Sequence, residues 1–137
     1  MENVRTLKAR DVMTENVVRI DEDSTVIHAI GKMQDKNVSS LLVNRRETEI
    51  QKPEEDAWGI VTRKDVVNKV IDPGKDPADM QVRQIMTKPV VTVHPGLTLK
   101  YCARLMHMTN IRRAPVFDGD DIVGILSNTD IFNAVQT

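Results

Sequence analysis

An internal repeat constrains this chain of 137 residues more than any other feature of its sequence. Residues 13–43 align without a gap with residues 86–116, and GIVTRKDVV (59–67) aligns with GILSNTDIF (124–132). The identical pairs in the longer match are Met13/Met86, Thr14/Thr87, Val17/Val90, Val18/Val91, Thr25/Thr98, Met33/Met106, Asn37/Asn110 and Val43/Val116. Such repeats are copies of one supersecondary unit that share a core, so we expect two related halves.

Each copy is predicted to contain the elements β-α-β-β-α. Runs rich in β-branched residues and bounded by turn residues predict strands; these are VVRI, VSSLLV and WGIV in the first copy and VVTV, IRRAPV and VGIL in the second. Apolar residues at helical spacing predict a helix after each first strand: Val26, Ile27, Ile30 and Met33, or Leu99, Cys102, Ala103 and Met106. A second helix follows each third strand and carries Val66, Val67 and Val70, or Ile131, Phe132 and Val135.

The ends of the first helix are marked in both copies. Ser24 or Thr25 and, in the second copy, Thr98 are suitable N-caps, because their side chains can accept a hydrogen bond from an orphan amide. Asn37 and Asn110 stand where the helix should end, and asparagine tolerates the left-handed conformation found there.

The predicted fold class is α+β, with two duplicated β-α-β-β-α units related by a pseudo-two-fold axis and packed through their sheets. One unit alone is too small to bury both faces of its sheet. The first motif is expected at 9–71 and the second at 83–137, with a linker at 72–82 in a stretch rich in Pro, Gly and Asp. Residues 44–58 form a charged insertion between two strands of the first copy.

Composition excludes several classes of protein. A net charge of −1 gives no reason to expect a nucleic-acid polymer or a membrane surface as partner. Without an apolar run of about 20 residues or a secretory signal, a cytoplasmic protein is expected. Because the repeats extend nearly from one end of the chain to the other, a free-standing protein is expected. A single cysteine, Cys102, and three histidines give no disulfide and no pattern of metal ligands.

Catalysis is not expected. The chain has no GxSxG, no HExxH and no paired histidine and aspartate that would supply a nucleophile or a general base. It also lacks a P-loop and a GxGxxG turn, so a bound nucleotide would be held in another way and not hydrolysed.

The duplicated pattern G-h-h-[ST]-x-x-D, where h is apolar, is the strongest candidate for chemistry. It pairs Thr62 with Asp65 and Ser127 with Asp130 at two strand-to-helix junctions. A hydroxyl three residues before a carboxylate is the pattern of a capping box, which only closes a helix. The functional alternative is that the helix start offers amides to an anion while the carboxylate accepts the two hydroxyls of a ribose. If Asp65 and Asp130 only capped their helices, and if the neighbouring cavities were too narrow for adenosine, the ribose-binding interpretation would fail. Only the prediction of a duplicated scaffold would then remain.

These motifs, together with the repeated MT-x-x-VV and the amphipathic helix, resemble the CBS (cystathionine β-synthase) domain. Two copies in tandem resemble a CBS pair, also called a Bateman module, and the resemblance extends from about Ala9 to Val135. It implies two clefts that commonly bind adenosyl compounds such as AMP, ADP, ATP or S-adenosylmethionine, with no required cofactor. It also implies that two pairs frequently form a disc-like homodimer.

The resemblance further implies a set of nucleotide-binding residues in which each cleft mixes the two copies. Val18 and Ser39 should line the cleft served by Ser127 and Asp130. Val91 and Arg112 should line the cleft served by Thr62 and Asp65. Thr14 and Thr87 are candidates for contacts with the base or are simply turn residues.

Arg112 and Arg113 form a local basic cluster that suits phosphate capture, although a solvated strand end is an equally good interpretation. The first copy has Ser39 and Ser40 there, so the two clefts should differ in affinity for anions. We expect a regulatory module that binds adenine nucleotides and signals to an unidentified regulated protein through the insertion 44–58 and the outer helices. The alternatives are an interaction module with empty clefts, or a binder of S-adenosylmethionine or NAD.

Overall fold

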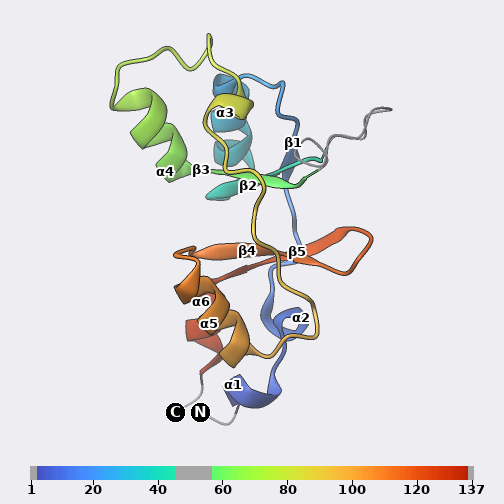
Figure 1. Ribbon diagram of the computed structural model, residues 1–137. Coiled ribbons are helices and arrows are strands. Elements are labelled where there is room, and N and C mark those ends of the chain that lie inside the picture. Colours follow the sequence, from blue (N-terminus) through green and yellow to red (C-terminus); the bar gives the residue numbers. More distant parts are fainter. Residues whose placement is uncertain (1–2, 46–56, 136–137) are drawn as a thin grey trace. The chain divides into compact units, whose positions relative to one another are not determined.

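The computed structural model describes residues 3–45 and 57–135. The chain divides into two compact units, of which unit 1 comprises Met1–Val17 with Val91–Thr137 and unit 2 comprises Val18–Val90 (Figure 1). Most of the insertion at 44–58 lies outside the described residues, so its predicted role as a contact surface is a matter of sequence alone. The α+β class is confirmed, because both units combine a sheet with helices.

Unit 2 contains a sheet of three strands in the order β1 (Arg19–Ile20), β2 (Ser40–Val43) and β3 (Gly59–Thr62). β1 pairs with β2 in parallel, and β2 pairs with β3 in the predicted antiparallel hairpin. The helices α3 (Val26–Lys36) and α4 (Arg63–Val66) lie on one side of this sheet (Figure 1). The segment η1 (Val67–Ile71) continues α4 as a π-helix, and η2 (Val82–Gln84) is a 3₁₀ turn.

Unit 1 is built on the hairpin of β4 (Arg113–Phe117) and β5 (Ile122–Ser127). The helices α5 (Leu99–Met108) and α6 (Asn128–Ala134) lie on one side of it, together with the short helices α1 (Asn3–Thr6) and α2 (Ala9–Val12) (Figure 1). The strand predicted at 90–93 is reduced to a single parallel bridge between Val93 and Val116. One bridge suffices to place this segment beside β4, and the buried side chain of Val93 then packs into the core of unit 1.

The Met-Thr segment before each predicted first strand pairs with the third strand of the other copy. Thr14 and Ile125 exchange two backbone hydrogen bonds of 2.9 Å within unit 1, and Thr87 and Ile60 do the same within unit 2. The units therefore do not coincide with the sequence repeats, because the packing assigns residues 1–17 to the second hairpin and residues 82–90 to the first.

Both motif glycines lie next to these two backbone bridges. A Cβ on Gly124 would come within 3.1 Å of the carbonyl oxygen of Thr14, and a Cβ on Gly59 within 3.1 Å of that of Thr87. The glycine in G-h-h-[ST]-x-x-D thus has a packing role that is separate from the cap, because only a residue without Cβ lets the second backbone approach so closely.

The predicted helix ends agree in position with the structure at all four places, although one cap lacks its side-chain hydrogen bond. Thr25, rather than Ser24, is the N-cap of α3 and accepts a hydrogen bond from the His28 amide, whereas the Thr98 side chain makes no such bond at α5. Asn37 and Asn110 have φ values of 51° and 55°, as expected for left-handed asparagines after a helix.

The last helix of each copy buries less of its apolar surface than its sequence suggests. Val66 and Val70 are buried in unit 2, but Val67 is 53% exposed and Phe132, its equivalent in unit 1, is 77% exposed. Large apolar side chains are more often buried in a core or an interface, so the exposure of Val67 and Phe132 marks an apolar surface on both helices.

Candidate functional site

The two motif junctions have the same hydrogen-bonded geometry. In unit 2 the hydroxyl of Thr62 accepts a hydrogen bond of 3.1 Å from the Asp65 amide, and Oδ2 of Asp65 accepts one of 2.9 Å from the Thr62 amide. In unit 1 the Ser127 hydroxyl accepts from the Asp130 amide at 3.1 Å, and Oδ2 of Asp130 accepts from the Ser127 amide at 2.9 Å. Both motifs are therefore complete capping boxes.

Capping uses only part of the hydrogen-bonding capacity of each carboxylate. Each box uses only the Oδ2 atom, whereas an ionised carboxylate can accept about four hydrogen bonds through its two oxygens. The box instead fixes the carboxylate in one orientation and leaves Oδ1 for another donor. The capping and ribose-binding interpretations are therefore compatible in geometry, although the structure directly shows the first.

Around the Ser127–Asp130 junction, the structure gathers several of the other predicted site residues of unit 1. Arg113 is paired with Ser127 across β4 and β5, and the carbonyl oxygen of Arg112 accepts a hydrogen bond of 2.8 Å from the Asn128 amide. The Arg112 side chain is exposed, and Thr14 flanks β5. Val91, half-buried, precedes the bridge at Val93.

The predicted residues of unit 2 have an equivalent arrangement. The carbonyl oxygen of Ser39 accepts a hydrogen bond of 3.1 Å from the Arg63 amide, beside the Thr62–Asp65 box, and that of Val18 accepts one of 2.9 Å from Leu42. Thr87 is bonded to β3. The assignment of Val18 and Ser39 to the cleft of Asp130, and of Val91 and Arg112 to that of Asp65, joins residues of different units and stays a prediction.

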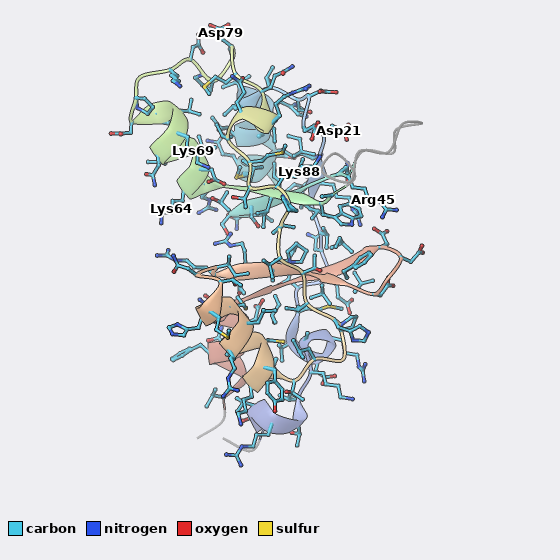
Figure 2. The ribbon with its side chains drawn as sticks, viewed as in Figure 1. Asp21, Arg45, Lys64, Lys69, Asp79 and Lys88 are labelled. Carbon is cyan, nitrogen blue, oxygen red and sulfur yellow. The ribbon has the colours of Figure 1, made fainter. Side chains whose placement is uncertain are left out.

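One residue at the first junction, Lys69, was not predicted from the sequence. Its ammonium group lies 3.2 Å from Oδ1 of Asp65 and donates a hydrogen bond of 2.8 Å to the carbonyl oxygen of Ile85. The signal was present, since an acidic residue four positions before a lysine on one helix is a favourable ion pair. Figure 2 shows Lys69 on the helical segment that also carries Lys64.

Two hollows of unit 2 differ in chemical character. One, of about 290 Å³, is lined by Asp21, Glu22, Asp23, Ser24, Asn44 and Arg45; its three carboxylates disfavour a nucleotide phosphate. Beside it, Glu22 is 3.0 Å from Lys88 in a nearly buried ion pair. The other, a groove of about 510 Å³ between α3 and the α4–η1 segment, is mainly apolar and includes Ile30, Met33, Val66, Val67 and Ile71.

The surroundings of Cys102 and Trp58 indicate packing roles for both side chains. Cys102 is fully buried in the core of unit 1, and burial raises the pKa of its thiol to about 11, which keeps it protonated and unreactive. The guanidinium carbons of Arg19 and Arg45 lie over the Trp58 ring, at 5.3 and 5.8 Å from its centre. Within residues 3–45 and 57–135, no cluster of three histidine, cysteine or acidic side chains could hold a metal ion, and no helix there could span a membrane.

Comparison with known proteins places these junctions in a family. The profile described as CBS domain matches the chain twice, over residues 9–72 and 82–137. The hexameric CBS-CP12 protein from bloom-forming cyanobacteria is 44% identical in sequence, with a TM-score of 0.84, over 92% of this chain and 69% of that chain. The CBS domain-containing protein YhcV of Bacillus subtilis is 27% identical over 122 residues, which are 89% of this chain and 81% of YhcV.

A further relative, the uncharacterized protein MK0525 of Methanopyrus kandleri, is 29% identical over 130 residues, or 93% of this chain and 62% of MK0525. Two relatives from Methanocaldococcus jannaschii are matched over 46% and 32% of their lengths. The chain thus spans between a third and three fifths of these three relatives, so their complete activities do not transfer to it.

Proposed function

Because the chain belongs to the CBS domain family, whose tandem pairs are in general regulatory modules, we propose that it binds an adenine nucleotide, AMP, ADP or ATP, and regulates a partner protein. The chain acts as a sensor rather than an enzyme, because its carboxylates hold the ligand and do no acid-base chemistry. A ligand can shift the arrangement of the module only by binding one arrangement more tightly than another, so the signal must be read by the regulated protein.

The observation that supports this function most directly is the pattern of hydrogen bonds to the Asp130 carboxylate. Its box fixes the carboxylate through Oδ2, and no described residue bonds to Oδ1. A fixed anionic oxygen that still accepts hydrogen bonds suits the vicinal hydroxyls of a ribose, which are donors. Arg112, whose side chain is exposed and which the family resemblance assigns to the cleft of Asp65, supplies a cation for a phosphate group there.

The replacement Asp130→Asn separates capping from ligand binding. The amide oxygen can still accept the hydrogen bond from Ser127, but an NH₂ group takes the place of Oδ1 and cannot accept a bond from ribose. Isothermal titration with AMP should show an affinity about tenfold to hundredfold lower, because one or two charge-assisted hydrogen bonds are lost. If Asp130→Asn binds AMP as tightly as the wild type does, this proposal is wrong.

The chain supplies its own control in a carboxylate that bonds the amide three residues before it but has no reciprocal side-chain cap. Oδ2 of Asp11 accepts a hydrogen bond of 2.8 Å from the Lys8 amide at the start of α2, where the cap residue is a lysine and not Ser or Thr. Asp11→Asn makes the same chemical change at a carboxylate outside the repeated motif. It should leave AMP affinity unchanged, so an equal loss in both variants would point to a general loss of fold.

A second candidate is a module for protein interaction with empty clefts, and the completeness of both capping boxes favours it. A thermal-shift panel of AMP, ATP, S-adenosylmethionine and NAD distinguishes the two functions. A ligand present at about 100 times its Kd raises stability by about 2.7 kcal/mol. A rise with S-adenosylmethionine or NAD alone would redirect the ligand assignment, whereas no rise with any of the four supports the interaction module.

We further propose that the chain forms a homodimer through its exposed helical faces. The cyanobacterial CBS-CP12 protein, 44% identical over the matched region, is hexameric, so association of copies occurs on a closely similar fold. In this chain unit 1 exposes Tyr101 and Phe132, and unit 2 exposes Ile27, Val67 and Ile71, each by about half or more. Apolar side chains gathered on helices are the usual core of an interface between identical subunits.

A further inference from the structure

Lys69 distinguishes the two junctions, whose capping boxes are otherwise the same. It holds Oδ1 of Asp65 at 3.2 Å, the oxygen that the capping box leaves unused. Its second bond, to the Ile85 carbonyl oxygen at 2.8 Å, anchors the ammonium group from the other side. A lysine fixed by two acceptors loses less entropy on holding the carboxylate than an untethered surface lysine would.

The second copy has no counterpart of this lysine. With the registration of Asp65 on Asp130, position 69 corresponds to Ala134. Among residues 3–45 and 57–135, no cation pairs with Asp130, whose described bonds are those of the capping box. Asp65 therefore accepts hydrogen bonds from both sides, while Asp130 keeps one oxygen for a ligand.

We propose that Lys69 is a specificity-determining residue that makes the two sites unequal for ribose, so that Asp130 holds the tighter adenosine site and Asp65 the weaker one. This inference rests on the proposed nucleotide-binding function. The ammonium group occupies an acceptor position on Oδ1 and neutralises the carboxylate, and both effects weaken the charge-assisted hydrogen bonds that a vicinal diol donates. A ligand at Asp65 must share or displace Lys69, and one at Asp130 meets no such competitor.

This difference in ribose affinity between the two sites has another cause than the difference in phosphate affinity that Arg112 and Ser39 predict. An arginine changes the affinity for phosphate, whereas Lys69 changes the affinity for the sugar. Adenosine, which has no phosphate, therefore reports on Lys69 alone, and 2′-deoxyadenosine, which has no 2′-hydroxyl, reports whether the diol is the group involved.

The test isolates each site before Lys69 is changed. In the full chain carrying Asp130→Asn, isothermal titration with adenosine measures the Asp65 site. Adding Lys69→Met, which keeps the apolar stem and removes the ammonium group, should tighten adenosine binding there by about fivefold, the upper range for an exposed ion pair. Adenosine should gain more than 2′-deoxyadenosine, and Lys69→Arg, which keeps the cation, should gain little.

Two controls make the result specific. Lys64 lies on the exposed first turn of α4 (Figure 2), and no described side-chain bond involves it. Lys64→Met therefore removes the same charge next to Asp65 without removing such a bond, and it should leave adenosine affinity unchanged. In the complementary background, Asp65→Asn, the remaining site is that of Asp130, and Lys69→Met should have no effect on it.

The outcomes separate this inference from the proposed function. If adenosine binds the wild type at two sites of equal affinity, or if Lys69→Met weakens binding in the Asp130→Asn background, the role assigned to Lys69 is refuted while nucleotide binding stands. If neither adenosine nor AMP binds any form of the protein, the proposed function fails and the inference fails with it. Tightening confined to the Asp65 site supports both.

Discussion

Alanine at Gly124 should destabilise the protein, although a Gly-to-Ala change in a strand usually stabilises it slightly. A Cβ at this position would lie 2.5 Å from Sδ of Met13, 2.8 Å from its Cγ and 3.1 Å from the carbonyl oxygen of Thr14. The methionine side chain can rotate, at the cost of its packing in the core of unit 1. The Thr14 carbonyl cannot move freely, because it accepts a 2.9 Å hydrogen bond from Ile125.

The expected cost follows from overpacking. Forcing an extra methyl group into a packed site typically costs about 1–3 kcal/mol, and the lower half applies here because one of the two neighbours is flexible. Gly31 provides the matched control, since it lies within α3, is exposed, and has no atom within 4 Å of the place that a Cβ would occupy. Gly31→Ala should stabilise by about 0.5–1 kcal/mol, because alanine restricts the unfolded chain and favours the helix.

Urea unfolding followed by circular dichroism measures both variants. With a slope of about 2 kcal/mol per M of urea, the middle of the usual range, Gly124→Ala should lower the midpoint by about 0.5–1 M, and Gly31→Ala should raise it. Equal shifts of the same sign would show that the effect is a general Gly-to-Ala difference. A midpoint for Gly124→Ala at or above that of the wild type would refute the packing role assigned to the motif glycine.

Two further predictions concern the buried thiol and the exposed helical face. Because burial raises the pKa of Cys102 from 9.0 to about 11, its contribution to stability is complete below about pH 9 and is lost as the pH rises towards 11, on the order of 2–3 kcal/mol. Urea unfolding at pH 8 and pH 10.5 should show this loss in the wild type and a smaller one in Cys102→Ala; equal losses would contradict it. In sedimentation equilibrium, Phe132→Ser should raise the Kd of the dimer by at least about tenfold, and Asn133→Ser, on the same helix, should not. An unchanged mass for Phe132→Ser would exclude this face from the interface.

The amino-acid sequence by itself determined the features whose causes are local. The alignment of the copies predicted the order of elements, and the hydroxyl-carboxylate spacing predicted both capping boxes, because a bond between residues three apart needs no other part of the chain. The left-handed asparagines Asn37 and Asn110 were predictable for the same reason. The salt bridge from Asp65 to Lys69 also follows from spacing along one helix and could have been predicted from the sequence.

Other features depended on partners far away in the chain, so only the tertiary structure decided them. Repetition predicted a first strand in each copy but not that Thr14 would pair with Ile125 and Thr87 with Ile60, since a β-bridge is specified by whichever segment packs alongside. The crowding above Gly124 and the second bond of Lys69, to Ile85, are set by the same long-range packing. Local hydrogen bonding thus produced the same capping box at both junctions, and the sequence made them different by placing Lys69 where the second copy has Ala134. The tertiary fold added the second anchor of that lysine, at the carbonyl oxygen of Ile85.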